Sequence, residues 1–369
     1  MKYYLIAGER SGDLHGANLM KGIRQHDPDA EFRAWGGDLM QAQGAALVMY
    51  YTDLAFMGFL EVARNITTIL GFLKKCKADI LDYRPDVLIL IDYPGFNLRI
   101  AAFAKKKGVK VCYYISPKVW AWNQKRAWKI KASVDRMFVI FPFEVDFYKK
   151  YGYEVTYVGN PLMDAIESFT PNPDFLSQNR LDNKRIIALL PGSRKQEVTG
   201  MLDTMLSIKS AFPQHEFVVA GVNSLPASLY EPYRNLTNVT IVFEATYDLL
   251  SVAEAALVAS GTATLETALF AVPEVVCYQT SGISYAIAKR LIRVPFISLV
   301  NLIMEKESVR ELIQDDFSEE KLTTELQAIV PDGHKRKAIE ADYRILRDKV
   351  GAAGASQRAG AEIVSYLRG

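Results

Sequence analysis

The sequence contains two series of short apolar runs separated by helix-like stretches, and this feature most limits its fold. Some runs, such as 87–91 and 255–259, contain no polar residue at all. The first series comprises 3–7, 87–91, 109–115 and 136–140, and the second 185–190, 216–220, 239–243, 255–259 and 274–278. Segments that are apolar on both faces are typical of strands buried in a parallel sheet, where helices cover both sides. The sequence therefore predicts an α/β protein with two parallel-sheet domains.

The length agrees with two domains. The chain has 369 residues, of which 50% are hydrophobic, which is enough for two cores and too many for a disordered polymer. Asn160-Pro161 and the proline-containing stretch 170–174 form the best linker candidate. We expect a first domain over 1–165 and a second over 166–344, followed by a charged, helical C-terminal segment.

The sequence carries no pattern typical of export, membrane spanning or metal binding. No stretch of about 18 apolar residues runs without charge, and the N-terminus turns polar at Glu9 and Arg10. Cys76, Cys112 and Cys277 are scattered, as are the four histidines, which predicts neither a disulfide framework nor a metal cluster. We expect a protein of the reducing cytoplasm that needs no metal and no cofactor.

Positive charge is concentrated in the first half. Residues 1–165 hold 23 Lys or Arg and 17 Asp or Glu, a net charge of +6, and the rest of the chain carries −4. Such a half favours a phosphate-bearing partner or an anionic membrane surface, although a solvated basic face is the simpler interpretation. Nucleic acid is not expected in a chain whose overall charge is only +2.

Residues 57–75 have apolar side chains at helical spacing, flanked by Lys74, Lys75 and Lys77. One interpretation is a helix that packs against the core. The other is an interfacial helix, or a groove for acyl chains, with the lysines near lipid headgroups.

In open α/β sheets, ligands bind beyond the carboxyl ends of the strands, so the residues there are the first site candidates. The first strand leads into Gly8, Glu9 and Ser11, which predict either a close-approach loop or a capped turn. The second leads into Asp92, a carboxylate placed to act as a general base or as a structural cap.

The third strand leads into a segment that contains Trp120, Lys125 and Arg126. Aromatic and cationic side chains together could line a groove for a sugar phosphate, and a packed aromatic corner is the alternative.

The second half repeats the arrangement of strand, small residues and helix. Ser193 and Arg194 follow one strand, where helix amides and a guanidinium suit a diphosphate. Ser260, Gly261 and Thr262 follow another, and Glu266, one turn into the next helix, could bind a ribose diol. Two such loops in one domain predict a site for a nucleotide diphosphate.

Taken together, the motifs resemble those of the lipid-A-disaccharide synthases, glycosyltransferases of lipopolysaccharide assembly. They run in one order along the chain: AGERSGD at 7–13, FMGFLEV at 56–62, IDYPGFN at 91–97, SPKVWAW at 116–122, LPGSR at 190–194, ASGTATLE at 259–266 and SLVNL at 298–302. The set is specific, although no single member is.

The resemblance implies a GT-B fold, in which two Rossmann-like domains face a cleft and the C-terminal helix, about 345–369, packs back on the first domain. It implies transfer of a sugar from UDP-2,3-diacylglucosamine to 2,3-diacylglucosamine 1-phosphate, with a β-1,6 linkage, inversion, release of UDP and no metal. It also implies a cytoplasmic protein bound peripherally to the inner membrane of a Gram-negative bacterium, and it leaves a homodimer open.

The resemblance further implies roles for individual residues. Asp92 matches the general base and Glu9 a second catalytic position near the acceptor. Met57 matches a position near the acceptor and its acyl chains, and Arg194, Glu266 and Asn301 match the UDP side. Together with the residues of the loops and of the 57–75 segment, the predicted site comprises, for the acceptor and its acyl chains, Ser11, Met57, Phe59, Leu60, Trp120, Lys125 and Arg126, and for UDP, Ser193, Arg194, Ser260, Gly261, Thr262, Glu266 and Asn301. Two alternatives stay open: another enzyme that uses UDP-N-acetylglucosamine, of the muramyl-lipid transferase or 2-epimerase type, and a non-catalytic nucleotide- or lipid-binding module.

Overall fold

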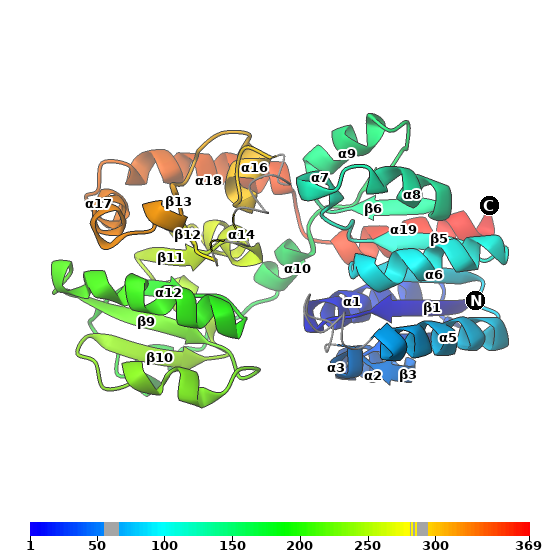
Figure 1. The fold of residues 1–369 in the computed structure, drawn as a ribbon, viewed down its shortest axis with the longest axis horizontal. Helices are drawn as coiled ribbons and strands as arrows, with labels where there is room; N and C mark the ends of the chain where they lie inside the picture. The colour runs from blue at the N-terminus through cyan, green and yellow to red at the C-terminus, as the bar shows by residue number, and fades with distance from the viewer. Residues whose placement is uncertain (55–65, 281, 283–284, 286–293) are drawn as a thin grey trace. The chain divides into compact units, whose positions relative to one another are not determined.

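The computed structural model describes the whole chain except residues 55–65, 281, 283–284 and 286–293, and it divides into two compact units (Figure 1). The first unit comprises Met1–Asp164 and Val350–Gly369, and the second Ala165–Lys349. The C-terminal segment rejoins the first unit at Val350 rather than at about 345, because the helix α18 (Arg336–Val350) belongs almost entirely to the second unit.

The first unit contains a seven-stranded parallel sheet in the order β3-β2-β1-β4-β5-β6-β7. The strands are β1 (Lys2–Ala7), β2 (Glu31–Gly36), β3 (Ala46–Tyr50), β4 (Val87–Ile91), β5 (Lys110–Tyr114), β6 (Arg136–Val139) and β7 (Thr156–Tyr157). The four predicted strands are β1, β4, β5 and β6. Sequence reasoning missed the other three because β2 is interrupted by Arg33, β3 is only partly buried and β7 has two residues.

Helices cover both faces of this sheet. On one face α5 (Ile66–Tyr83), α6 (Pro94–Lys106) and α8 (Arg126–Ser133) pack side by side, and on the other α1 (Arg10–His26) packs against α19 (Ala355–Arg368) (Figure 1). The shorter helices are α2 (Asp38–Ala42), α3 (Tyr51–Leu54), α7 (Val119–Trp122), α9 (Pro142–Lys149) and α10 (Pro161–Glu167), of which α10 continues from the first unit into the second.

The helix expected over 57–75 is described only from Ile66, where α5 begins, and α5 continues to Tyr83. Ile69, Leu73 and Cys76 are buried at helical spacing, so this part of the segment is a core helix. Residues 57–65 lie outside the described part of the chain.

Several polar contacts hold α19 against the first unit. The hydroxyl groups of Ser356 and Tyr114 are 3.1 Å apart, and Arg358 Nε donates to the Val158 carbonyl at 2.8 Å. At the far end of α19, Arg368 donates to the His26 carbonyl at 2.6 Å. The last residues of the chain therefore complete the layer that α1 begins.

The second unit contains a six-stranded parallel sheet in the order β10-β9-β8-β11-β12-β13. The strands are β8 (Arg185–Leu190), β9 (His215–Gly221), β10 (Val239–Phe243), β11 (Ala255–Ala259), β12 (Glu274–Tyr278) and β13 (Glu311–Ile313). Its remaining helices are α11 (Phe175–Gln178), α12 (Lys195–Ser207), α13 (Thr246–Val252), α14 (Thr262–Leu269), α16 (Leu299–Met304) and α17 (Glu319–Ile329). Only the three-residue β13 was not predicted.

Each sheet reverses its strand order once, between β1 and β4 in the first unit and between β8 and β11 in the second. At such a reversal the connections diverge to opposite faces and leave room for a ligand at the carboxyl ends. Four of the predicted site loops follow these four strands, and the loop with Trp120, Lys125 and Arg126 follows β5. Among the described helices, none is both long enough and apolar enough to span a membrane. All three cysteines are buried free thiols.

Candidate active site

The register of the first sheet brings the predicted catalytic residues to one edge. Ala7 of β1 lies opposite Ile91 of β4, so the loops that begin at Gly8 and Asp92 start level with each other. Burial raises the pKa of Asp92 from 3.8 to about 6; Lys118 partly offsets this rise, and Glu9 adds to it. The charges of Glu9 and Lys118 therefore both act on Asp92.

Asp92 lies in a turn whose backbone conformation is unfavourable for residues other than glycine. Asp92 and Tyr93 have φ angles of 42° and 49°, in the left-handed region that residues other than glycine rarely adopt. The buried Asn97 side chain donates to the carbonyl oxygens of Ile91 at 3.2 Å and Asp92 at 2.8 Å. The Tyr113 hydroxyl also donates to the Asp92 carbonyl. These donors hold the turn and thereby set the direction of the Asp92 side chain.

The Tyr93 ring packs against Gly8 and so fills the space between the loops after β1 and β4. A Cβ atom at Gly8 would lie 2.3 Å from the Tyr93 ring, so only glycine permits this approach. Burial, assisted by the charge of Glu9, raises the pKa of Tyr93 to about 12. Sequence reasoning did not single out Tyr93, Asn97 or Lys118, although each lies in a quoted motif and follows the end of a strand.

The first turn of α1 contains two residues with different roles. Ser11 is exposed close to Glu9, as an acceptor contact requires. Asp13 is buried and accepts hydrogen bonds from the amides of Gly37 at 2.7 Å and Met40 at 3.1 Å. Asp13 thus stabilises the start of α2, and its role is structural.

Trp120 lies in a packed corner. Its side chain is 5% exposed, and its indole N–H donates to Glu144 at 3.1 Å. Glu144 also accepts from the amide of Phe141 at 3.0 Å, and burial raises its pKa to about 7. This environment favours the aromatic-corner interpretation for Trp120 itself.

The other predicted acceptor residues are placed differently. Lys125 is exposed and Arg126 is partly exposed where α8 begins. Met57, Phe59 and Leu60 lie outside the described residues.

In the second unit, the loop after β8 folds around a carboxylate of its own. Gly192 has a φ angle of 105°, and Glu197 accepts hydrogen bonds from the amides of Ser193 at 3.0 Å and Arg194 at 3.1 Å. The Arg194 guanidinium is 80% exposed and lies 3.4 Å from Glu197. The amides predicted to bind a diphosphate therefore already hold an anionic group, and the Arg194 side chain offers an exposed cation beside them.

The loop after β11 lies beside it, because Val258 of β11 is opposite Leu190 of β8. Ser260 Oγ donates to the Ile297 carbonyl at 2.9 Å, while α14 begins at Thr262, directly after Gly261. Glu266 accepts from the Tyr247 hydroxyl at 2.8 Å, and burial raises its pKa. The two loops and Glu266 thus gather at the strand-order reversal.

Asn301 is buried, with 0% exposure, and all its hydrogen-bonding capacity is used within the chain. Its Nδ2 donates to the Val309 carbonyl and to Glu311, both at 2.9 Å. Its Oδ1 accepts from the amides of Ser308 at 2.8 Å and Val309 at 3.0 Å. Asn301 therefore stabilises the site through buried hydrogen bonds, and its side-chain amide has no donor or acceptor left to bind a nucleotide.

Glu311 links Asn301 to the loop after β11 through further hydrogen bonds. It accepts from the amides of Ile297 at 3.0 Å and Ser298 at 2.9 Å, and the Ile297 carbonyl receives Ser260 Oγ. Hydrogen bonds thus connect Asn301 to Ser260 through Glu311 and Ile297.

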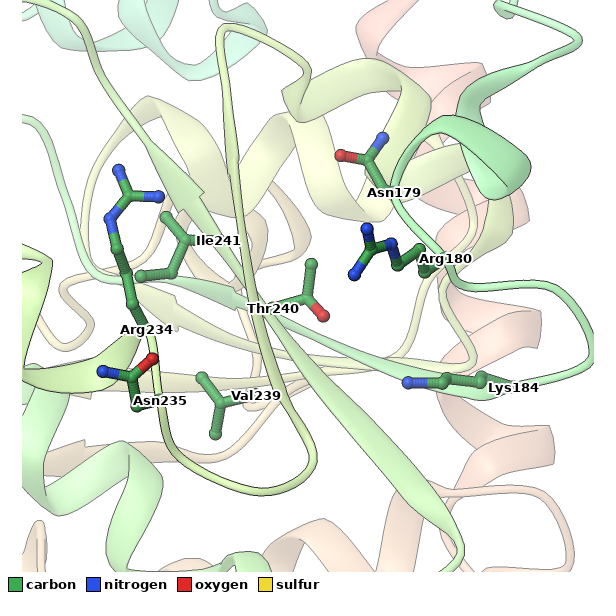
Figure 2. A pocket seen from close by; sticks show the side chains of 8 residues that line it. All are labelled: Asn179, Arg180, Lys184, Arg234, Asn235, Val239, Thr240 and Ile241. Atoms are coloured by element: carbon green, nitrogen blue, oxygen red, sulfur yellow. The ribbon is translucent and has the colours of Figure 1, made fainter.

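A hollow of about 460 Å³ lies elsewhere in the second unit, beside β10. Figure 2 shows Arg180 and Lys184 on one side of Thr240 and Arg234 on the other. Lys184 pairs with Glu216 at 2.8 Å and Arg234 with Glu231 at 2.9 Å, which offsets most of the positive charge. None of the predicted site residues lines this hollow. Within the described part of the chain, no three His, Cys, Asp or Glu side chains cluster as a metal site requires.

Comparison with known proteins adds independent information. The sequence model of the family described as lipid-A-disaccharide synthetase matches residues 3–362. The lipid-A-disaccharide synthase of Syntrophus aciditrophicus (strain SB) is 39% identical over 372 residues, covering 99% of this chain and 97% of the relative. That of Geobacter sulfurreducens is 36% identical over 370 residues, covering 98% and 96%.

Solved structures agree on the fold. UDP-GlcNAc 2-epimerase from Neisseria meningitidis, bound to UDP-GlcNAc, superposes with a TM-score of 0.68 at 14% identity, covering 100% of both chains. CalG4, the calicheamicin glycosyltransferase, gives 0.62 at 15% identity, covering 100% of this chain and 98% of that one. The fold is therefore the expected α/β class, with two Rossmann-like parallel-sheet domains of the GT-B type.

Proposed function

The chain belongs to the lipid-A-disaccharide synthase family, and from this premise we propose that it transfers the sugar of UDP-2,3-diacylglucosamine to 2,3-diacylglucosamine 1-phosphate. Members of the family are glycosyltransferases that form the lipid A disaccharide, with a UDP-sugar as donor and a sugar phosphate as acceptor. The proposal adds the acyl pattern of the substrates, a β-1,6 linkage, inversion at the anomeric carbon and independence from metal.

In the proposed step, Asp92 takes the proton of the acceptor 6-hydroxyl while that oxygen bonds to the anomeric carbon of the donor. The bond from this carbon to the diphosphate breaks, and UDP leaves with the electron pair. The observation that carries the proposal is the environment of Asp92. A pKa of about 6 makes it a stronger base than an ordinary Asp, yet leaves it ionised at pH 7.

We assign the acceptor to the edge formed by the loops after β1, β4 and β5. Glu9 and Ser11 lie at the start of α1, where they can contact the sugar hydroxyls, and Glu9 stands beside the base. Lys118, Lys125 and Arg126 supply positive charge for the 1-phosphate, since cations bind phosphate oxygens strongly. Trp120 shapes the loop that presents them. Met57, Phe59 and Leu60 are assigned to the acyl chains from the family resemblance.

We assign UDP to the two loops of the second unit. Arg194 is the cation for the diphosphate, and it stabilises the negative charge that develops as UDP departs. Ser193, Ser260, Gly261 and Thr262 offer hydroxyl and amide donors around it. Glu266 accepts from the ribose diol, and Asn301 positions the Ser260 loop through Glu311 without touching the nucleotide.

The acylated substrates are membrane lipids, so we place the reaction at the cytoplasmic surface of the inner membrane. The bilayer then supplies both acylated substrates, and the soluble product is UDP.

The test is incubation of the purified protein with both acylated sugars in the presence of EDTA, with UDP and disaccharide followed by mass spectrometry. We expect equal amounts of the two products. Asp92→Asn is the matched control: it should bind UDP normally and release almost none from the substrates. Conversion of soluble UDP-N-acetylglucosamine without an acylated acceptor would instead identify an epimerase. Binding of both substrates without UDP release would identify a non-catalytic module.

A further inference from the structure

The loop after β5 begins beside Asp92. Ile91 of β4 lies opposite Tyr114 of β5, and the Asp92 amide donates to the Tyr114 carbonyl at 3.4 Å. Four positions further on, Lys118 stands directly before α7 with an exposed side chain. Because the two loops leave adjacent strands at the same level, this cation can approach the carboxylate. The pKa of Asp92 agrees with that placement: burial raises it most, and the charge of Lys118 is the strongest influence that lowers it.

Lys118 lies between two anchored residues. Ser116 is buried, and its hydroxyl lies 2.7 Å from the hydroxyl of Tyr148 on α9. Trp120 is also buried and donates its indole N–H at 3.1 Å to Glu144, which lies on the same helix. The chain is therefore fixed two residues before Lys118 and again two residues after it.

Glu144 is the centre of this anchor. Its side chain is fully buried and accepts the Trp120 N–H at 3.1 Å and the amides of Ile140 at 3.1 Å and Phe141 at 3.0 Å. Burial raises the pKa of Glu144 to about 7, and these donors limit the rise because they favour the ionised form. One donor comes from the loop after β5 and two come from the loop after β6. Glu144 thus ties the two loops together.

The start of the loop after β5 needs such a restraint. Ile115 has a φ angle of 66°, in the left-handed region that is unfavourable for a β-branched residue. Its amide donates to the Phe138 carbonyl of β6 at 3.1 Å. Because a strained turn persists only where its neighbours impose it, the direction of this loop depends on the contacts made by Ser116 and Trp120.

We propose that Lys118 is the counter-ion of Asp92 and that Glu144 is the positioning residue that holds Lys118 in place through Trp120. The inference deepens the proposed function and rests on it for the role of Asp92 as base. It gives Lys118 a task besides binding the acceptor phosphate, which is to keep Asp92 ionised at a desolvated site.

The other groups that face Asp92 do not supply this charge. Among the described residues, Glu9 from the loop after β1 opposes Lys118, because its negative charge raises the pKa of Asp92. Tyr113 of β5 donates its hydroxyl to the Asp92 main-chain carbonyl, and burial raises the pKa of this phenol so far that it stays neutral. Lys118 is therefore the cation on which the ionisation of the base depends.

The test is a pH titration of the free protein, followed by ¹³C NMR with carboxyl-labelled aspartate. The Asp92 signal is identified by its absence from Asp92→Asn. Lys118→Gln removes the cation that favours the carboxylate, so it should raise the pKa of Asp92 by about 0.2–0.7, as expected for one exposed ion pair. Glu144→Gln and Trp120→Phe should shift this pKa in the same direction.

A double variant tests whether Glu144 acts through Lys118. Lys118→Gln combined with Glu144→Gln should shift the pKa of Asp92 no further than Lys118→Gln alone. A further, additive shift would overturn the positioning role. If Glu144→Gln does not fold, Trp120→Phe replaces it in the same comparison, since it removes only the N–H that donates to Glu144.

The matched control for lost stability is Trp35→Phe. It removes an indole N–H that donates to the Tyr4 hydroxyl at 2.8 Å, at another buried place in the first unit. This variant should lower the midpoint of urea unfolding about as much as Trp120→Phe, yet leave the pKa of Asp92 unchanged. An equal shift in Trp35→Phe would mean that general loosening, and not Lys118, moves the pKa.

Kinetics separate the counter-ion role from phosphate binding. With both acylated substrates, the acid limb of kcat/KM should move to higher pH in Lys118→Gln, by the amount that NMR measures. Lys125→Gln, at a residue assigned only to the acceptor phosphate, should lower kcat/KM equally at every pH and leave the limb in place. A Lys118→Gln variant with an unmoved limb and an unchanged Asp92 pKa would overturn the proposal.

The two proposals can fail separately. A protein that shows the NMR shifts but releases no UDP would refute the proposed function and leave the pairing of Lys118 with Asp92 intact. A protein that releases UDP from both substrates, with an Asp92 pKa that Lys118→Gln does not move, would do the opposite.

Discussion

The side-chain amide of Asn97 donates a hydrogen bond of 2.8 Å to the main-chain carbonyl of Asp92. This bond links a buried side chain in the first turn of α6 to the residue proposed as general base. Without such donors, two successive left-handed residues would cost roughly 1–3 kcal/mol each. The orientation of the base is thus imposed by its neighbours.

Replacing Asn97 by Ala should lower kcat/KM at least tenfold through kcat, because Asp92 loses the donor that holds its turn. The affinity for UDP should not change, since UDP is assigned to the second unit. Tyr113→Phe, which removes one donor, should have a smaller effect in the same direction. Steady-state kinetics and calorimetric titration with UDP measure the two quantities. Variants that lose only stability, with normal kcat per folded molecule, would contradict a positioning role.

The rate should depend on the ionisation of Asp92. Its pKa is about 6, so the fraction of molecules with an ionised base falls as pH decreases through that value. We expect log kcat/KM to drop by about one per pH unit below pH 6. Asp92→Asn should lose about 10²–10⁴ in turnover at pH 7.5. An acid limb centred near pH 4 would show that Asp92 is not the titrating base.

Asp92→Asn should also stabilise the fold at high pH. The folded pKa, about 6, lies above the ordinary value of 3.8, so the folded protein binds this proton more tightly than the unfolded chain does. Stability is therefore lost as pH rises from about 4 to 6, and the full cost of the buried charge persists above 6. Urea unfolding should show the variant roughly 1–3 kcal/mol more stable than wild type at pH 8. The difference should vanish near pH 4, and an equal difference at both pH values would rule out this linkage.

Glu197 should tune the affinity for UDP. Glu197→Gln keeps an acceptor for the amides of Ser193 and Arg194 but removes the negative charge beside the diphosphate cation. We expect UDP to bind about twofold to fivefold more tightly, which corresponds to the loss of one exposed ion pair. Arg194→Ala should weaken binding about tenfold to a hundredfold, as expected for a charge-assisted hydrogen bond. Weaker binding by Glu197→Gln would mean that this carboxylate contributes to the nucleotide site.

Asn301 should matter more for stability than for direct contact with UDP. Asn301→Ala leaves several buried polar groups without partners, at about 1–3 kcal/mol each. Asn301→Asp should be worse, because it sets a second carboxylate where Nδ2 now lies 2.9 Å from Glu311. Urea unfolding and UDP titration at low temperature distinguish the roles. Normal stability with lost UDP affinity would identify Asn301 as a direct ligand.

Much of the sheet architecture was predictable because apolar runs report burial locally. The bounds of β4, β8, β10, β11 and β12 coincide with the predicted strands. Once these strands were assigned to parallel sheets, the rule that ligands bind at carboxyl ends led to Glu9, Asp92, Arg194 and Ser260. The rule works because every strand of a parallel sheet ends at the same edge.

Other features were not predictable from local pattern. Trp120 and Asn301 carry suitable chemistry in suitable motifs, but burial engages the Trp120 N–H with Glu144 and all of Asn301 with Val309, Ser308 and Glu311. Their partners lie between 7 and 24 positions away in the sequence. A motif shows which atoms are present, and the fold decides which of them remain available.

The chain's own pattern of apolar runs, glycines and charged loops determined that it folds into two parallel sheets and which residues stand at their carboxyl edges. Tertiary structure alone decided the ionisation and the direction of Asp92, through burial and through donors from β5 and α6. The reason is physical: strand formation depends on neighbours along the chain, whereas desolvation, hydrogen-bond saturation and surface charge depend on neighbours in space.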